Sequence, residues 1–212
     1  MCDFIITHFY KKSNLPIDKI YPPCYTYYMF TQIIGGIELT FETSDTSFSP
    51  LGADKGTLAM LSVVNFTSTD KLLDLGCGYG IAGIYAAKII GAENVVMSDV
   101  CAEAAGLAKQ NAERNGVGSI KVIRSDGFRD ITESGFSLIL SNPPYHADFS
   151  IPKHFIEKGF NRLRVGGRMF MVTKRKNWYR NKFTAVFGGV KVTETDGYYV
   201  FCAEKRSTQY AK

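Results

Sequence analysis

The sequence predicts an α/β fold with a doubly wound, seven-stranded and mostly parallel sheet that ends in a C-terminal antiparallel hairpin. From residue 71 to residue 173, short apolar runs alternate with helical segments, which requires a parallel sheet covered by helices on both faces. Two further alternating segments flank Asp196 and Gly197, a pair typical of a tight hairpin turn. The expected strands are residues 71–75, 95–99, 120–124, 136–140, 168–173, 190–194 and 198–203.

Helices are expected between these strands. The helix over residues 81–90 ends at Gly91, and the helix over residues 102–115 ends at Gly116, because glycine readily adopts the left-handed conformation that terminates helices. Two more helices are expected at residues 57–66 and 152–163.

The chain is expected to divide into an N-terminal extension with short strands, residues 1–50, and a domain over residues 51–212. Pro22 and Pro23 prevent a long helix in the extension. Residues 36–42 alternate apolar and polar side chains, which predicts a half-exposed strand.

Composition excludes several classes of protein. With 45% hydrophobic and 21% charged residues among 212, the chain is neither disordered nor collagen-like. The five cysteines are scattered and never form a C-x-x-C pair, which argues against a disulfide framework or a zinc knuckle. The three histidines lack metal-ligand spacing, so no metal site is expected. No apolar run approaches the ~18 residues of a membrane span, and Lys11 and Lys12 follow the first apolar run instead of preceding it as in a secretory signal, so we expect a cytoplasmic protein.

Positive charge is concentrated in the last third of the chain. Residues 151–212 carry 14 basic against 4 acidic side chains, whereas the rest of the chain is acidic on balance. Within this basic segment, Lys174, Arg175 and Lys176 precede Trp178. Such a cluster is able to contact phosphates while the aromatic ring stacks on an unpaired base, although a solvated basic face is the simpler interpretation of a charge run.

A glycine-rich turn follows the first strand of the alternating region. Gly78, Gly80 and Gly83 satisfy G-x-G-x-x-G, and Asp99 lies at the end of the next strand, as in dinucleotide-binding proteins. An overlapping motif, D-x-G-x-G, is formed by Asp74, Gly76 and Gly78 and suits a nucleoside without a pyrophosphate. In either case the ligand lies at the carboxyl edge of the sheet.

The tetrapeptide after the strand at 136–140 favours the second interpretation. Pro143 and Pro144 have no N–H to donate, so the loop presents backbone carbonyls, and Asn142 adds a side-chain acceptor. Acceptors without donors suit an exocyclic amino group, whose ring is expected to stack on Tyr145.

Together these motifs resemble class I S-adenosylmethionine-dependent methyltransferases, in particular the small-domain branch that includes small-subunit ribosomal RNA guanine amino-methyltransferases. The resemblance covers about residues 35–205. It rests on LLDLGCGYG at 72–80, Asp99, Ser125-Asp126, SNPPYH at 141–146 and the closing hairpin.

The resemblance implies S-adenosyl-L-methionine as cofactor and a Rossmann-like fold. Asp74, Gly76 and Gly78 are expected at the methionine part of the cofactor and Cys77 close to it, with Asp99 at the ribose hydroxyls and Asp126 at the adenine amine. Asp54-Lys55-Gly56-Thr57 resembles the D-x-G-T that closes over the cofactor in this branch.

The resemblance also implies methylation of a base amine, most directly guanine in ribosomal RNA. Asn142, Pro143 and Tyr145 are expected to receive the amine. Asn142 is also expected to border the cofactor. The expected substrate-binding residues are Pro144, His146, Lys174, Arg175, Lys176 and Trp178.

Three other functions remain open at this point. Glutamine methyltransferases acting on release factors share N-P-P-Y, but they carry a helical N-terminal domain that is not evident here. A nicotinamide-dependent oxidoreductase would use the glycine motif and leave N-P-P-Y unexplained. A non-catalytic RNA-binding protein would keep the fold without turnover.

Overall fold

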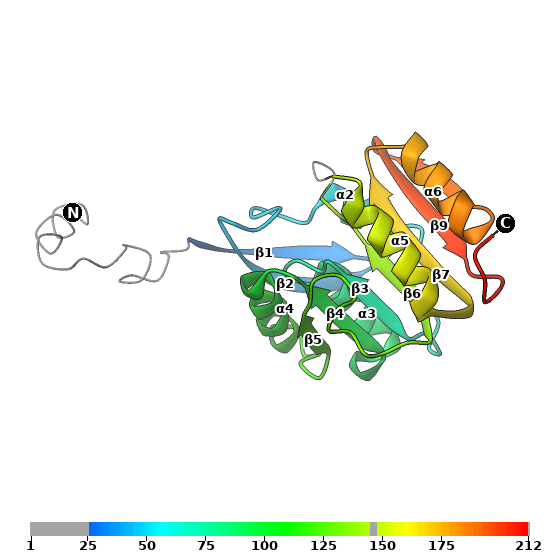
Figure 1. Cartoon of the computed structure of the whole chain (residues 1–212). Coiled ribbons are helices and arrows are strands. Elements are labelled where there is room, and N and C mark those ends of the chain that lie inside the picture. The colour runs from blue at the N-terminus through cyan, green and yellow to red at the C-terminus, as the bar shows by residue number, and fades with distance from the viewer. Residues whose placement is uncertain (1–25, 145–147, 212) are drawn as a thin grey trace, which may run out of the picture.

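The computed structural model describes residues 26–144 and 148–211 (Figure 1). Its main sheet has the strand order β5-β4-β3-β6-β7-β9-β8. All neighbours from β5 to β7 pair in parallel, and β9 is antiparallel to both β7 and β8. This arrangement confirms the predicted fold class. The strands are β3 (Leu72–Leu75), β4 (Val95–Asp99), β5 (Lys121–Arg124), β6 (Phe136–Ser141), β7 (Leu163–Thr173), β8 (Lys191–Thr195) and β9 (Tyr198–Glu204).

Helices cover both faces of the sheet. Successive residues of each strand point to opposite faces, so they pack against different helices. Leu72 belongs to the core formed with α2, α3 and α4, whereas Leu73 belongs to the core formed with α5 and α6. Both leucines are fully buried. The helices are α2 (Lys55–Leu61), α3 (Ile81–Ile90), α4 (Ala102–Arg114), α5 (Ser150–Arg162) and α6 (Asn177–Phe187), with a short 3-10 turn, η2 (Ala92–Asn94).

The hairpin at the end of the sheet is tight, as predicted. Asp196 and Gly197 both have positive φ, at 51° and 76°. These values match the two-residue turn whose twist follows that of the strands it joins.

The helix expected at residues 57–66 is wrong in extent, since α2 begins at Lys55 and ends at Leu61. After its C-cap at Ser62, Val64 is buried in the core and Phe66 packs edge-on against Tyr85, with ring centroids 5.9 Å apart. These contacts are better satisfied by an extended chain than by another helical turn.

No element was predicted from the sequence at β1 (Tyr27–Ile34), at the short η2 turn or at α6. The basic residues of α6 obscure an apolar face at helical spacing, formed by Tyr179, Phe183 and Phe187, all buried. In the part of the chain that the structure describes, no helix is long and apolar enough to cross a membrane.

The strand β1 pairs with β2 (Ile37–Ser44) as an antiparallel ribbon, and β2 contains the strand expected at residues 36–42. One side chain of α4 ties this ribbon to the domain. The Oδ1 of Asn111 accepts the N–H of Glu42 at 2.8 Å, while its Nδ2 donates to the carbonyls of Glu42 (2.9 Å) and Tyr79 (3.0 Å). Asn111 therefore contacts both the ribbon and the glycine turn after β3.

Candidate functional site

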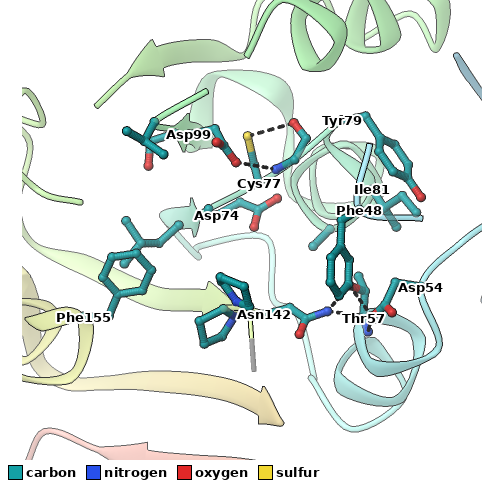
Figure 2. A pocket seen from close by; sticks show the side chains of 18 of the residues that line it. Phe48, Asp54, Thr57, Asp74, Cys77, Tyr79, Ile81, Asp99, Asn142 and Phe155 are labelled. Atoms are coloured by element: carbon teal, nitrogen blue, oxygen red, sulfur yellow. Dashed lines mark hydrogen bonds between the residues drawn. The ribbon is translucent and has the colours of Figure 1, made fainter. Parts of the chain in front are cut away.

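A cavity of about 320 Å³ opens at the carboxyl ends of β3, β4, β5 and β6 (Figure 2). Its volume lies in the range of small-molecule sites, roughly 300–1,000 Å³. The structure brings most of the predicted site residues together here. They are Asp74, Gly76, Cys77, Gly78, Asp99, Asp126, Asn142, Pro143 and Pro144.

The glycine turn forms the floor of the cavity because its backbone adopts conformations that other residues avoid. Gly76, Gly78 and Gly80 have φ of 74°, 55° and 98°. Gly83 serves packing instead, since a Cβ there would lie 2.5 Å from Met97. The positive φ angles of the turn let α3 begin directly after it. The missing side chain at Gly83 lets α3 pack close to β4.

Asp74 is buried, with 3% of its surface exposed, and its Oδ2 accepts the N–H of Gly83 at 2.8 Å. Burial raises the pKa of this carboxyl to about 7; the hydrogen bond from Gly83 opposes the rise, and the negative charge of Asp99 adds to it. Asp74 is thus a carboxyl that a neighbouring positive charge would readily ionise.

Asp99, at the end of β4, uses both carboxylate oxygens on the backbone. Its Oδ2 accepts the N–H of Gly78 at 2.9 Å, and its Oδ1 accepts the N–H of Cys101 at 2.9 Å. Each oxygen keeps a further lone pair, so the side chain can still receive hydroxyl groups from a ligand.

Two further polar groups border the cavity. Asp126 is exposed on the turn after β5. The Oγ of Ser98 is buried and has no hydrogen-bond partner among the described residues. Both groups remain available to a ligand that enters beside Asp99.

The start of the loop after β6 is anchored by two consecutive side chains. The Oγ of Ser141 donates to the carbonyl of Leu75 at 2.8 Å, so β6 and β3 end at the same level. The Nδ2 of Asn142 donates to the Oδ1 of Asp54 at 2.6 Å and to the Oγ1 of Thr57 at 3.0 Å (Figure 2). The D-x-G-T segment thereby closes one side of the cavity.

Among the described residues, the predicted Lys174, Arg175, Lys176 and Trp178 do not line this cavity. Tyr145 and His146 lie outside the described residues. Trp178 stacks on Phe149, with centroids 4.4 Å apart, and Arg175 lies 4.9 Å from the centre of the same ring. The basic cluster nevertheless follows β7 and so lies at the carboxyl edge of the sheet.

Lys174 and Lys176 of that cluster also lie over aromatic rings. Lys174 lies 5.0 Å from the ring centre of Tyr198, and Lys176 lies 4.8 Å from that of Tyr199. Lys176 is also 3.9 Å from a carboxylate oxygen of Glu194. These contacts fix the direction of the cationic side chains beside the C-terminal hairpin.

Several cavity residues were not predicted from the sequence. They include the apolar side chains of Phe48, Tyr79, Ile81 and Phe155. The hydroxyl of Tyr79 donates to the carbonyls of Ser49 (3.3 Å) and Gly52 (3.1 Å), and burial raises its pKa. Its position between Gly78 and Gly80 was a usable signal, whereas nothing local marks Phe48 or Phe155. Within residues 26–144 and 148–211, no group of three His, Cys, Asp or Glu side chains is arranged to hold a metal ion.

A doubly wound sheet with a glycine turn after its central strand, an acid at the end of the neighbouring strand and an antiparallel C-terminal hairpin defines an α/β protein of the methyltransferase class. The chain belongs to the methyltransferase small domain family, whose model matches residues 38–202. This assignment confirms the resemblance seen in the motifs.

Relatives and solved structures agree with this assignment. The chain is 32% identical to ribosomal RNA small subunit methyltransferase C of Pseudoalteromonas atlantica, over 74% of this chain and 47% of that protein. It is 29% identical to uncharacterized protein YbxB of Bacillus subtilis, over 79% of this chain and 87% of that protein. The structure of the Thermus thermophilus 16S rRNA N2 G1207 methyltransferase, RsmC, in complex with AdoMet and guanosine matches with a TM-score of 0.73 at 26% identity, over 88% of this chain and 52% of that chain. The chain thus spans about half the length of these ribosomal RNA methyltransferases.

Proposed function

We propose that this protein transfers a methyl group from S-adenosylmethionine to the exocyclic amine of guanine in ribosomal RNA. The observation that carries the proposal is the shared cavity. Asn142 and Pro143, which present acceptors, line the same space as the glycine turn and Asp99. The names of the relatives, which act on ribosomal RNA, support the same substrate class.

The residues present fit the proposed cofactor. Asp74 is suited to the positively charged methionine end, Asp99 to the ribose hydroxyls, and Asp126 to the adenine amine. The unpartnered Oγ of Ser98 offers one more polar contact beside Asp99. When bound, S-adenosylmethionine supplies an electrophilic methyl group on a positively charged sulfur.

The acceptors of the loop after β6 are suited to orient a weak nucleophile. The Oδ1 of Asn142 and the carbonyl of Pro143 accept the two amine hydrogens, which directs the nitrogen lone pair toward the methyl group. Holding the reactants in this geometry contributes roughly 7–11 kcal/mol in favourable cases. Tyr145 is proposed to stack on the base, and Pro144 and His146 to border it.

We propose that RNA binds along the carboxyl edge of the sheet. Lys174, Arg175 and Lys176 lie on that edge, where they are positioned to contact phosphates, with Trp178 stacked beside them. Residues 51–212 form the proposed methyltransferase domain, to which the extension over residues 1–50 contributes Phe48 and Ser49. We expect the protein to act in the cytoplasm, where ribosomal RNA is available.

Calorimetric titration with S-adenosylmethionine, its demethylated product and NAD tests the cofactor, and tritium-methyl transfer to unmethylated small-subunit ribosomal RNA tests the acceptor. We expect binding of the first two ligands and label incorporation into guanine. Binding of NAD alone would contradict the proposed methyltransferase activity. Label in release factor but not in RNA would contradict RNA as the proposed acceptor.

A further inference from the structure

The amide of Asn142 is held by two residues of the α2 N-terminus. Its Nδ2 lies 2.6 Å from the Oδ1 of Asp54 and 3.0 Å from the Oγ1 of Thr57, although these partners are more than 80 positions away in sequence. In the described part of the chain, no donor reaches its Oδ1. The side chain is therefore held through its nitrogen alone.

These partners allow one orientation of the amide. A carboxylate oxygen only accepts hydrogen bonds, so the group that faces Asp54 must be the NH2 of Asn142. The inverted amide would place two oxygens 2.6 Å apart at a negatively charged group, with no proton between them. The Oδ1 of Asn142 consequently lies on the other arm of the amide, away from Asp54 (Figure 2).

The D-x-G-T segment is built for this contact. The same Oδ1 of Asp54 accepts the backbone N–H of Thr57 at 2.9 Å and so caps α2, which fixes the carboxylate at the helix start. A Cβ at Gly56 would lie 3.0 Å from that oxygen and 3.0 Å from the ring of Tyr198. All three fixed residues of D-x-G-T thus contribute to the contact. Asp54 and Thr57 accept hydrogen bonds from Asn142, and Gly56 leaves space for the Asp54 carboxylate.

We propose that Asp54 and Thr57 are positioning residues that set the orientation of the Asn142 amide and thereby select an amine over a carbonyl as the reacting group. With its NH2 held by Asp54, Asn142 presents an acceptor to the substrate. The inverted amide would present donors and would favour a keto oxygen. This inference rests on the proposed function and assigns the two residues a role in its substrate specificity.

Variants that keep the helix cap test the proposal by activity. Thr57→Val removes one acceptor but retains the backbone N–H that α2 needs, and Asp54→Asn removes the charge while remaining a good N-cap. We expect each to lower kcat at least tenfold, with KM for RNA and Tm near wild type. Thr57→Ser, which keeps the hydroxyl, is expected to retain activity. Wild-type kcat in both Thr57→Val and Asp54→Asn would overturn the proposal.

A reciprocal exchange is more specific. Asn142→Asp places two carboxylates in contact and is expected to be nearly inactive. Adding Asp54→Asn restores a donor-to-acceptor pair and leaves an oxygen free for the amine, so we expect the double variant to be at least tenfold more active than Asn142→Asp. A double variant no more active than the single one would overturn the proposal.

The orientation is also measurable without turnover. The NH2 signal of Asn142 in 1H–15N spectra is identified by its loss in Asn142→Asp, and its exchange with water is expected to quicken at least tenfold in Thr57→Val. Unchanged exchange in that variant would overturn the positioning role. If wild-type protein methylates no RNA, the proposed function fails, but this spectrum still decides how the amide is held.

Discussion

The Oδ2 of Asp99 lies 2.9 Å from the backbone nitrogen of Gly78, which joins the end of β4 to the glycine turn after β3. One carboxylate thereby shapes the turn and borders the cavity. Its replacement is expected to disturb ligand contacts and the ligand-binding backbone at the same time.

Asp99→Ala is accordingly expected to weaken S-adenosylmethionine binding by about 10- to 100-fold, as lost hydrogen bonds to a charged group contribute roughly 1.5–3 kcal/mol. Isothermal titration measures the change. Asp130→Ala, which removes an exposed carboxylate outside the cavity, serves as the control and should bind normally. Equal affinities of the two variants would show that Asp99 does not contact the cofactor.

Cofactor affinity should depend on pH through Asp74. Because the folded pKa of about 7 exceeds the ordinary value of 3.8, the folded protein holds a proton between these values. A ligand that places positive charge beside Asp74 must release that proton, so affinity should rise by up to about tenfold per pH unit below pH 7 and level off above it. Titrations in buffers of different ionisation enthalpy measure the released proton.

The same shift makes a prediction for stability. The contribution of Asp74 to the free energy of unfolding is largest below its unfolded pKa and is lost as the pH rises from about 4 to 7. In Asp74→Asn both pH dependences should disappear over that range, and the variant should unfold at a higher temperature than wild type at pH 7. A pH profile identical to that of wild type would contradict the assignment to this residue.

Two glycines of neighbouring helices provide a matched test of packing. A Cβ at Gly83 would lie 2.5 Å from Met97, so Gly83→Ala should destabilise the fold by about 1–3 kcal/mol. Gly106 in α4 has open space around it, so Gly106→Ala should stabilise by about 0.4–1 kcal/mol. Thermal unfolding compares the two, and a stabilised Gly83→Ala would contradict the close approach of α3 to β4.

Asn142→Ala is expected to abolish methyl transfer and leave S-adenosylmethionine affinity within a few-fold of wild type. The reason is that Asn142 is proposed to contact the substrate amine, whereas the acids at the ends of β3 and β4 hold the cofactor. Filter-binding and titration measure the two properties on one preparation. A parallel loss of both would make Asn142 a structural residue of the cavity.

Reversing the charge of Lys174, Arg175 and Lys176 together should weaken RNA binding and reduce its salt dependence. Loss of three phosphate contacts lowers the slope of log K against log salt concentration by about 2 for a single strand. Lys109→Glu, on the exposed side of α4 at the other end of the sheet, is the control. An unchanged slope would indicate that the cluster is an ordinary solvated surface.

Much of the fold was predictable because it depends on local signals. The α3 and β4 boundaries matched the predicted ones, since Gly91 ends the helix and an apolar run defines the strand. In contrast, α6 was missed because its cations dominate its composition, although Tyr179 and Phe183 form an apolar face. For α6, the basic composition indicated a solvated segment, whereas the spacing of the aromatic residues indicated a helix with a buried face. The spacing was correct.

The candidate site was predictable where residues follow strands directly. Asp74, Asp99 and Asn142 meet because the carboxyl ends of parallel strands share one edge. Phe48 and Phe155 reach the same cavity from a loop and from α5, and only the tertiary packing brings them there. The contact of Asn142 with Asp54 likewise depends on how α2 sits against the sheet, which no local pattern encodes.

Asn111 is expected to couple the local unfolding of two regions of the molecule. Its amide simultaneously bonds the β1–β2 ribbon and the carbonyl of Tyr79 in the glycine turn. Detachment of the ribbon therefore weakens the hydrogen bond from Asn111 to the glycine turn. The ribbon and the turn should unfold together as one cooperative unit. In native-state hydrogen exchange, the amides of β2 and of the glycine turn are then expected to share one opening free energy, and ligand in the cavity should protect a ribbon that it never touches.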